Sequence, residues 1–165
     1  MNRDCDYDAV CEDYFSHIYG DDWKQVDQIL TGISNAFDMV YMEGVKSVNK
    51  AISDYYDPAR VEQLSAVADL CAQQRALAKK HLNMPTRPQT VSWRMLLRHA
   101  EYCEKFAELM IEKALGHNFK AIELAQEFRQ VIGRFEMEIE PYYDHGLACR
   151  VLDHILQKPK GIILE

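Results

Sequence analysis

Residues 90–115 constrain the fold more than any other stretch of this sequence. Pro85 and Pro88 precede the stretch and Gly116 follows it, so about 26 residues can form one helix roughly 40 Å long. At about 100° per residue, apolar side chains occupy most of its circumference. The apolar arc is centred on Val91, Met95, His99, Tyr102, Cys103, Phe106, Leu109 and Met110, with Trp93 at its edge. Such a helix needs neighbours on several sides, which predicts the centre of an all-α domain.

Helical spacing and boundary residues predict five further helices. They cover residues 7–19, 22–43, 57–83, 118–140 and 143–156, and residues 45–56 are expected to form a loop. Asp57 followed by Pro58 is a strong helix start, and Asp22 with Gln25 resembles a capping box. The predicted fold is an all-α, up-and-down bundle of four long helices with a short helix at each end. It forms one domain, with a short helix in 1–20, the bundle in 21–157 and an apolar tail in 158–165.

Charge and composition exclude several classes of partner. The formal net charge is −7 without a basic run, so we expect no nucleic acid and no anionic membrane as partner. No apolar run approaches the ~18 residues of a membrane span, and the polar N-terminus does not resemble a signal peptide. The five cysteines are scattered and odd in number, which favours a reducing compartment. We therefore expect a cytoplasmic protein.

The sequence shows no complete pattern for catalysis or metal binding. Di-metal bundles use Glu-x-x-His on facing helices, but no acidic residue stands three positions before any of the six histidines. No glycine-rich phosphate loop and no Gly-x-Ser-x-Gly elbow occur either. His99, inside the apolar arc, fits a hydrogen-bonded core histidine better than a catalytic one. We therefore predict no catalytic residues, no metal ligands and no cofactor.

Aromatic residues beside acids at two helix ends are the candidate ligand-binding groups. The candidates are Tyr55 and Tyr56 before the third helix, Tyr142, Tyr143, Asp144 and His145 after Pro141, and Trp93 on the central helix. Tyrosine rings with neighbouring carboxylates would suit a sugar. The alternative is that the rings cap the ends of the core while their hydroxyls face water.

Two stretches carry a family resemblance. Residues 13–30, with the sequence DYFSHIYGDDWKQVDQIL, resemble the segment that follows the barrel in a family of uncharacterised glycoside-hydrolase-like bacterial proteins. Residues 92–103 (SWRMLLRHAEYC) with 113–116 resemble the helical C-terminal region of that family, and residues 141–152 extend the match. The family carries a barrel of the same broad kind as α-glucuronidases and β-hexosaminidases. Such a barrel needs ~250 residues, for which this chain has no room.

The resemblance implies a non-catalytic helical accessory domain that packs on a catalytic barrel domain and edges its carbohydrate cleft. No catalytic acid of the barrel has a counterpart here, so the chain itself is expected not to be an enzyme. The alternative hypothesis is a free-standing helical module for protein interaction or dimerisation, with a homo-oligomer as the assembly. A small bundle enzyme or metal binder is a third hypothesis, which the missing ligand spacing disfavours.

Overall fold

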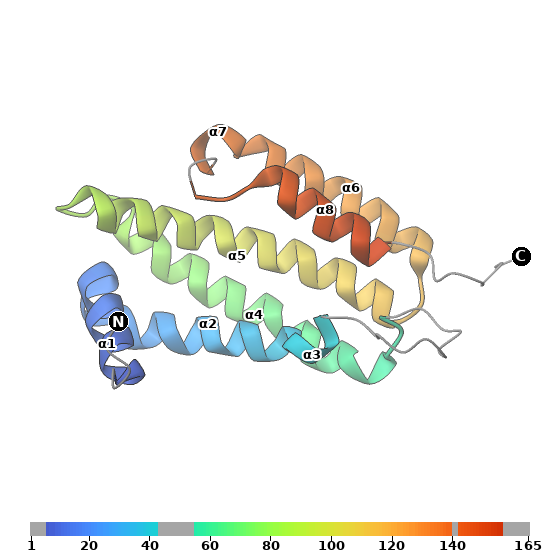
Figure 1. The fold of residues 1–165 in the computed structure, drawn as a ribbon, viewed down its shortest axis with the longest axis horizontal. Coiled ribbons are helices and arrows are strands. Elements are labelled where there is room, and N and C mark those ends of the chain that lie inside the picture. The colour runs from blue at the N-terminus through green and yellow to red at the C-terminus, as the bar shows by residue number, and fades with distance from the viewer. Residues whose placement is uncertain (1–5, 43–54, 140–141, 157–165) are drawn as a thin grey trace, which may run out of the picture.

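The computed structural model describes residues 6–42, 55–139 and 142–156, and the elements in these ranges are helical (Figure 1). The α-helices are α1 (Tyr7–Tyr19), α2 (Trp23–Phe37), α3 (Met39–Met42), α4 (Val61–Ala78), α5 (Arg87–Ala114), α6 (Asn118–Arg134), α7 (Glu136–Ile139) and α8 (His145–Leu156). Short 3-10 turns, η1 (Gly20–Asp22), η2 (Pro58–Arg60) and η3 (Lys79–His81), adjoin them. The all-α prediction is confirmed.

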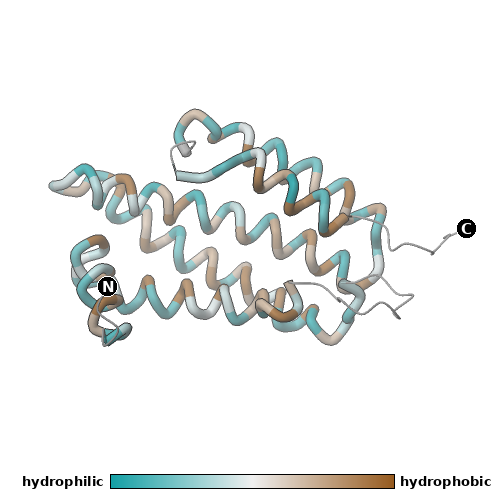
Figure 2. Tube along the Cα trace, in the orientation of Figure 1, coloured by the Kyte–Doolittle hydropathy of each residue, from teal (hydrophilic) through white to brown (hydrophobic). Residues whose placement is uncertain are grey.

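Helix α5 lies at the centre of the fold, as the apolar arc predicts. Helices α4 and α6 pack on α5, while α2 packs on α4 and α8 packs on α6. Figure 1 shows that α2, α4, α5, α6 and α8 alternate in direction along the chain. Figure 2 shows that apolar positions recur along these helices with polar positions between them. The longest helix therefore joins an α2–α4 half of the molecule to an α6–α8 half.

The core consists of two clusters that share α5. In the first, Val26 and Ile33 of α2 and Val67 of α4 pack near Trp93 of α5. The second is formed mainly by α5, α6 and α8, and its largest fully buried side chains are Leu109, Met110, Ile132, Leu152 and Ile155, together with Leu64 of α4. Full burial of one such side chain stabilises a fold by about 1.5–3 kcal/mol. The two clusters together therefore fix α5 on both of its sides.

Two predicted helix boundaries are confirmed by their capping residues. Helix α1 ends at Tyr19 because Gly20 adopts a positive φ of 61°. At the start of η2, Asp57 accepts a hydrogen bond from the Ala59 N–H, and Pro58 occupies the first turn. The predicted capping box at Asp22 is wrong. The Asp22 side chain makes no cap and instead lies 2.8 Å from His81 Nε2.

The predicted second helix is interrupted at Asp38. This residue has φ of 54°, and its carboxylate accepts from the Val40 N–H at 2.9 Å, which starts the separate helix α3. The carboxylate also accepts from Arg60 Nη1 at 2.6 Å. Val40, which the predicted helix over 22–43 includes, is 80% exposed in the structure. A capping residue held by a distant arginine overrides the continuous helical pattern.

Two further boundaries differ from the predictions. Helix α5 begins at Arg87 rather than Thr90, because Thr86 caps it and Pro88 fits within the first turn. The helix predicted over 118–140 ends at Arg134 and resumes as α7. Between the two, the Arg98 guanidinium stacks 3.6 Å from the centre of the Phe135 ring, and Arg98 also pairs with Glu138. These contacts hold Phe135 in a non-helical bend. The loop predicted over 45–56 lies mostly outside the described residues, and the tail predicted over 158–165 lies wholly outside them.

Candidate functional site

The candidate functional site is an apolar groove between α5 and α8, which we call the α5–α8 groove. Its volume is about 200 Å³. It is lined by His99, Tyr102, Cys103, Phe106, Phe128, Tyr143, Ala148, Val151 and Leu152. Most of these side chains are apolar or aromatic. The volume lies below the roughly 300–1,000 Å³ of typical small-molecule pockets. The groove is therefore suited to a few inserted apolar side chains rather than to a whole cofactor.

The floor of the groove comes from one side of α5. His99, Cys103 and Phe106 recur every three or four residues and so fall on the same side of the helix. Cys103 and Phe106 are half-buried and His99 is exposed, whereas Leu109 and Met110 further along α5 are fully buried. The Phe106 ring lies 5.3 Å from the ring of Phe37, at the end of α2. The floor is thus an apolar part of the central helix that its neighbours only partly cover.

Helix α8 forms the wall of the groove. Asp144 Oδ1 accepts from the Leu147 N–H at 2.8 Å and so caps the start of α8. This cap places the preceding Tyr143 ring 5.5 Å from the ring of Tyr102. We call Tyr143, just before α8, together with Leu147 and Val151 on α8 the α8 stripe, because they recur every four residues and are 38%, 57% and 46% exposed. The wall therefore continues onto the surface as an uncovered apolar stripe.

A chain of polar side chains runs from α4 to the floor of the groove. Gln74 Nε2 donates to the Leu96 carbonyl at 2.7 Å and to His99 Nδ1 at 3.0 Å. Because the Leu96 carbonyl only accepts, the amide nitrogen must face it, and His99 Nδ1 must act as an acceptor. The His99 proton therefore sits on Nε2, which lies 3.3 Å from Cys103 Sγ. Gln74 is 1% exposed, so its end of the chain is fixed inside the core, while His99 lies at the exposed end.

This polar chain does not supply an activated nucleophile. Burial raises the pKa of the Cys103 thiol to about 12, and burial also lowers the pKa of His99. Both groups are therefore neutral near pH 7. Forming a thiolate needs a base beside the thiol, but His99 Nε2, the ring nitrogen nearest Cys103 Sγ, already carries the proton. The geometry supports a structural role for the pair.

The Tyr102 hydroxyl is the polar group that the groove leaves without a partner. Tyr102 is 8% exposed, and its hydroxyl oxygen makes no hydrogen bond to any described group. Burial raises the pKa of Tyr102 to about 12, so the hydroxyl stays protonated. Its ring packs between Phe128 and Tyr143. The groove thus contains one buried hydroxyl among aromatic rings.

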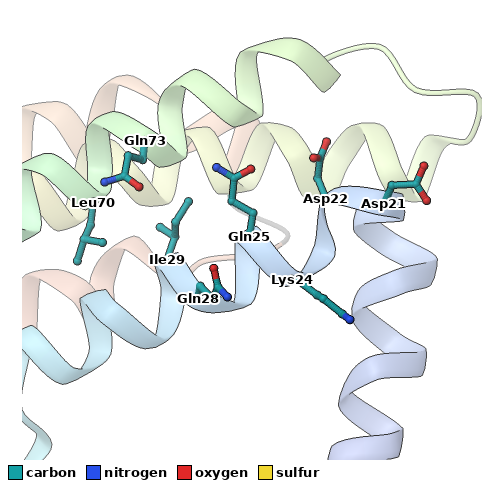
Figure 3. A pocket seen from close by; sticks show the side chains of 8 residues that line it. All are labelled: Asp21, Asp22, Lys24, Gln25, Gln28, Ile29, Leu70 and Gln73. Atoms are coloured by element: carbon teal, nitrogen blue, oxygen red, sulfur yellow. The ribbon is translucent and has the colours of Figure 1, made fainter.

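A second hollow lies between η1, α2 and α4 and has a volume of about 520 Å³. It is lined by Asp21, Asp22, Lys24, Gln25, Gln28, Ile29, Leu70 and Gln73 (Figure 3). Its lining is mainly polar, and Asp22 is engaged by His81. No described group in this hollow is both buried and unpartnered. The hollow therefore offers a wet surface without a built site.

Two of the predicted site residues lie in the core. Trp93 is 0% exposed and stacks on His81 with ring centres 4.4 Å apart. Tyr55 is 3% exposed, and its carbonyl accepts from the Tyr41 hydroxyl at 2.8 Å. Neither ring is accessible to a ligand in this fold. Core packing explains both residues, because a buried aromatic ring contributes a large apolar area.

The other predicted residues lie on the surface but are not brought together. Tyr56 packs against Gly116, while Tyr143 packs against Tyr102. Gly116 and Tyr102 are separated by 14 residues of mostly helical chain, roughly 21 Å. Tyr142 is exposed, Asp144 caps α8, and His145 Nε2 lies 3.5 Å from Cys149 Sγ. Of the predicted residues, only Tyr143 lines the groove.

Sequence reasoning missed the groove and the buried Gln74. The pattern of one helix does not show where a neighbouring helix stops covering it. The available signal was the α8 stripe, because Tyr143, Leu147 and Val151 recur at helical spacing on a side distinct from Leu152 and Ile155.

The described residues contain neither a metal-ligand group nor a membrane-spanning helix. Within residues 6–42, 55–139 and 142–156, no group of three or more His, Cys, Asp or Glu residues could hold a metal ion. None of the helices described is both long and apolar enough to cross a membrane.

No family model, no curated protein and no solved structure matches this chain. The resemblance to glycoside-hydrolase-like proteins therefore stays a prediction.

Proposed function

We propose that this chain is a non-catalytic helical interaction module, in which an up-and-down bundle presents the α5–α8 groove to the apolar face of a partner helix. The observation that supports this most is the continuous apolar surface formed by the groove floor and the α8 stripe. Surface apolar residues that gather in this way typically mark interaction sites. A helix laid in a groove inserts side chains spaced three or four residues apart, which matches the spacing on α5 and α8.

The lining of the groove supports a protein partner better than a carbohydrate. Sugar hydroxyls need several placed hydrogen-bonding groups, because an unpaired buried hydroxyl costs about 1–3 kcal/mol. Cys103 and His99 are paired with each other, which leaves few free donors and acceptors among the lining groups. The catalytic barrel domain implied by the resemblance is one possible protein partner. The groove geometry does not depend on that choice.

The proposal can be tested with an apolar dye and two matched variants. Wild-type protein at low micromolar concentration should enhance the fluorescence of 1-anilinonaphthalene-8-sulfonate, because the dye enters the exposed groove. Val151→Lys places a charge in the groove wall and should reduce the enhancement. Phe119→Lys is the control, since Phe119 is 82% exposed but does not line the groove. Absence of dye binding, or equal loss in both variants, would contradict the proposal.

A further inference from the structure

Helix α1 carries an uncovered apolar side that is separate from the α5–α8 groove. Tyr7, Val10 and Tyr14 recur at spacings of three and four residues, so they lie along one side of the helix, and we call them the α1 outer face. They are 78%, 49% and 62% exposed. The helix attaches to the bundle through another side, where the Tyr19 ring lies 5.0 Å from the ring of Trp93. The α1 outer face is therefore free to contact a partner.

Carboxylates on α1 border the outer face. Asp6 and Asp13 lie one helical turn before and after Val10, and the Asp13 side chain is 78% exposed. The nearest basic group to Asp13 among the described residues is the exposed His17, whose Nδ1 lies 3.4 Å away. Lys24 is the only lysine or arginine among residues 6–42, and it forms no ion pair with a described carboxylate. The negative charge along this edge is therefore largely unbalanced.

Helix α2 adds a further carboxylate at the Tyr7 end of the outer face. The pKa of Tyr7 is raised, first by its hydrogen bond with Cys11 and further by the negative charges of Asp8 and Asp27. Such an effect requires Asp27 of α2 to lie close to Tyr7. Asp27 is exposed, and no ion pair of Asp27 is present in the described part of the chain. An apolar face two helical turns long, or roughly 10 Å, thus lies between acidic groups from two helices.

We propose that the α1 outer face binds a basic amphipathic helix of another protein. The apolar side chains of that helix cover Tyr7, Val10 and Tyr14, and its lysines or arginines lie over Asp13 and Asp27. The inference goes beyond the proposed function, because it concerns a different surface and a partner of defined charge. Figure 1 shows α1 on the opposite side of α5 from α6 and α8, so this surface and the groove do not overlap.

Charge complementarity favours this partner over the alternatives. A second copy docked symmetrically would bring two outer faces of the same negative sign together, which opposes association. Nucleic acid and anionic membranes are repelled by this face for the same reason. A basic amphipathic helix meets carboxylates at the edges while its apolar side covers the exposed rings, so both features of the surface are used.

A fluorescence anisotropy titration of the full-length protein tests the proposal. The probe is a short labelled peptide of leucine and lysine whose leucines lie on one side of a helix. It should bind at low salt, and its dissociation constant should rise severalfold at high salt, because exposed charges are screened. A control peptide with serine in place of leucine keeps the lysines and should bind severalfold more weakly. Equal binding of the two peptides would overturn the proposal, because charge alone would then suffice.

Matched apolar variants locate the bound peptide. Val10→Ser should raise its dissociation constant severalfold, whereas Phe119→Ser should not, although Phe119 is also an exposed apolar residue. If Val10→Ser loses the helical far-ultraviolet signal, Tyr14→Ser takes its place. Equal binding by wild type and the α1 variant that folds would overturn the proposal.

Matched charge variants test the role of the carboxylates. The double variant with Asp13→Asn and Asp27→Asn should weaken binding severalfold. The control with Glu62→Gln and Glu127→Gln removes the same charge from exposed positions on α4 and α6 and should have a smaller effect. Equal weakening in both would show that the peptide responds to net charge, which would overturn the assigned site.

Val151→Lys separates this proposal from the proposed function. Val151 lines the groove, so this variant should bind the peptide as wild type does. Loss of binding in Val151→Lys with normal binding in Val10→Ser would place the peptide in the groove, which overturns the α1 interface and supports the proposed function. A wild-type protein that binds no peptide at low salt would overturn the α1 interface and leave the dye test of the groove unaffected.

Discussion

Truncation of two neighbouring residues on α5 separates a buried position from a groove position. Leu109 is fully buried, so Leu109→Ala should leave an enclosed cavity and cost about 3–5 kcal/mol of unfolding free energy. Phe106 is central in the apolar arc, so the helical phase alone assigns it a similar loss. In the structure, however, its ring is half-buried, and truncation mainly widens a groove that is already open.

The cost at Phe106 can be worked from its contacts. Half burial should contribute about half of the ~2–3 kcal/mol of a fully buried phenylalanine. The ring also contacts Phe37 at 5.3 Å and Phe128 at 6.1 Å, and each ring pair adds about 0.5 kcal/mol. Phe106→Ala should therefore cost about 2 kcal/mol. Glu108 is partly exposed and pairs with Lys105 on the same helix, so Glu108→Ala should cost well under about 1 kcal/mol of unfolding free energy.

Urea denaturation at low protein concentration measures these differences. Tryptophan fluorescence is a suitable signal because Trp93 is fully buried in the folded protein. A loss at Phe106 equal to that at Leu109 would show that Phe106 is enclosed in solution and that the groove is not open. A loss at Glu108 comparable to that at Leu109 would show that the helical phase of α5 is wrong.

Three further predictions concern backbone, pH and metal. Gly133→Ala should stabilise the fold by about 0.5–1 kcal/mol, because Gly133 is helical and an added Cβ meets nothing within 4 Å. Gly116→Ala should destabilise the fold, because Gly116 has φ of 82°, and thermal melts of both variants check the two expectations. Burial lowers the pKa of His99 below 6.5, so on acidification the unfolded chain binds a proton that the folded chain does not, and the free energy of unfolding is kept above pH ~6.5 and falls as the pH drops below it. His99→Gln should reduce this fall in unfolding free energy, measured by urea denaturation at several pH values, and an equal pH dependence in both proteins would argue against it. Chelator should leave the thermal midpoint unchanged, and a drop of roughly ten degrees would reveal a metal site.

The main packing of the fold follows from local patterns in the sequence. The apolar arc of residues 90–115 predicts the central position of α5, because a helix with one polar strip can be stable only among several neighbours. The start at Asp57 and the end at Gly20 follow from capping chemistry that acts within a few residues. These features depend on residues that are near each other in the chain.

The parts that could not be predicted depend on contacts between distant residues. The break at Asp38 is held by Arg60, and the bend at Phe135 is held by Arg98. Gln74 is buried because it reaches the Leu96 carbonyl of another helix, although a glutamine on a helix usually indicates a surface. The groove itself is set by how far α8 covers α5, which neither helix specifies alone. The candidate site therefore became visible only once the helices were placed together.

Helix α1 has no fully buried residue, and this separates it energetically from the rest of the chain. It is attached through ring contacts such as Tyr19 on Trp93 and through the hydrogen bond from Gln89 Nε2 to the His17 carbonyl. Segments with few buried contacts open locally at a small fraction of the global unfolding free energy. The amide protons of α1 should therefore exchange with solvent far sooner than those of α5, whose exchange requires the two core clusters to come apart together. The molecule thus combines one cooperative unit, held by the central helix, with an N-terminal helix that can detach without unfolding it.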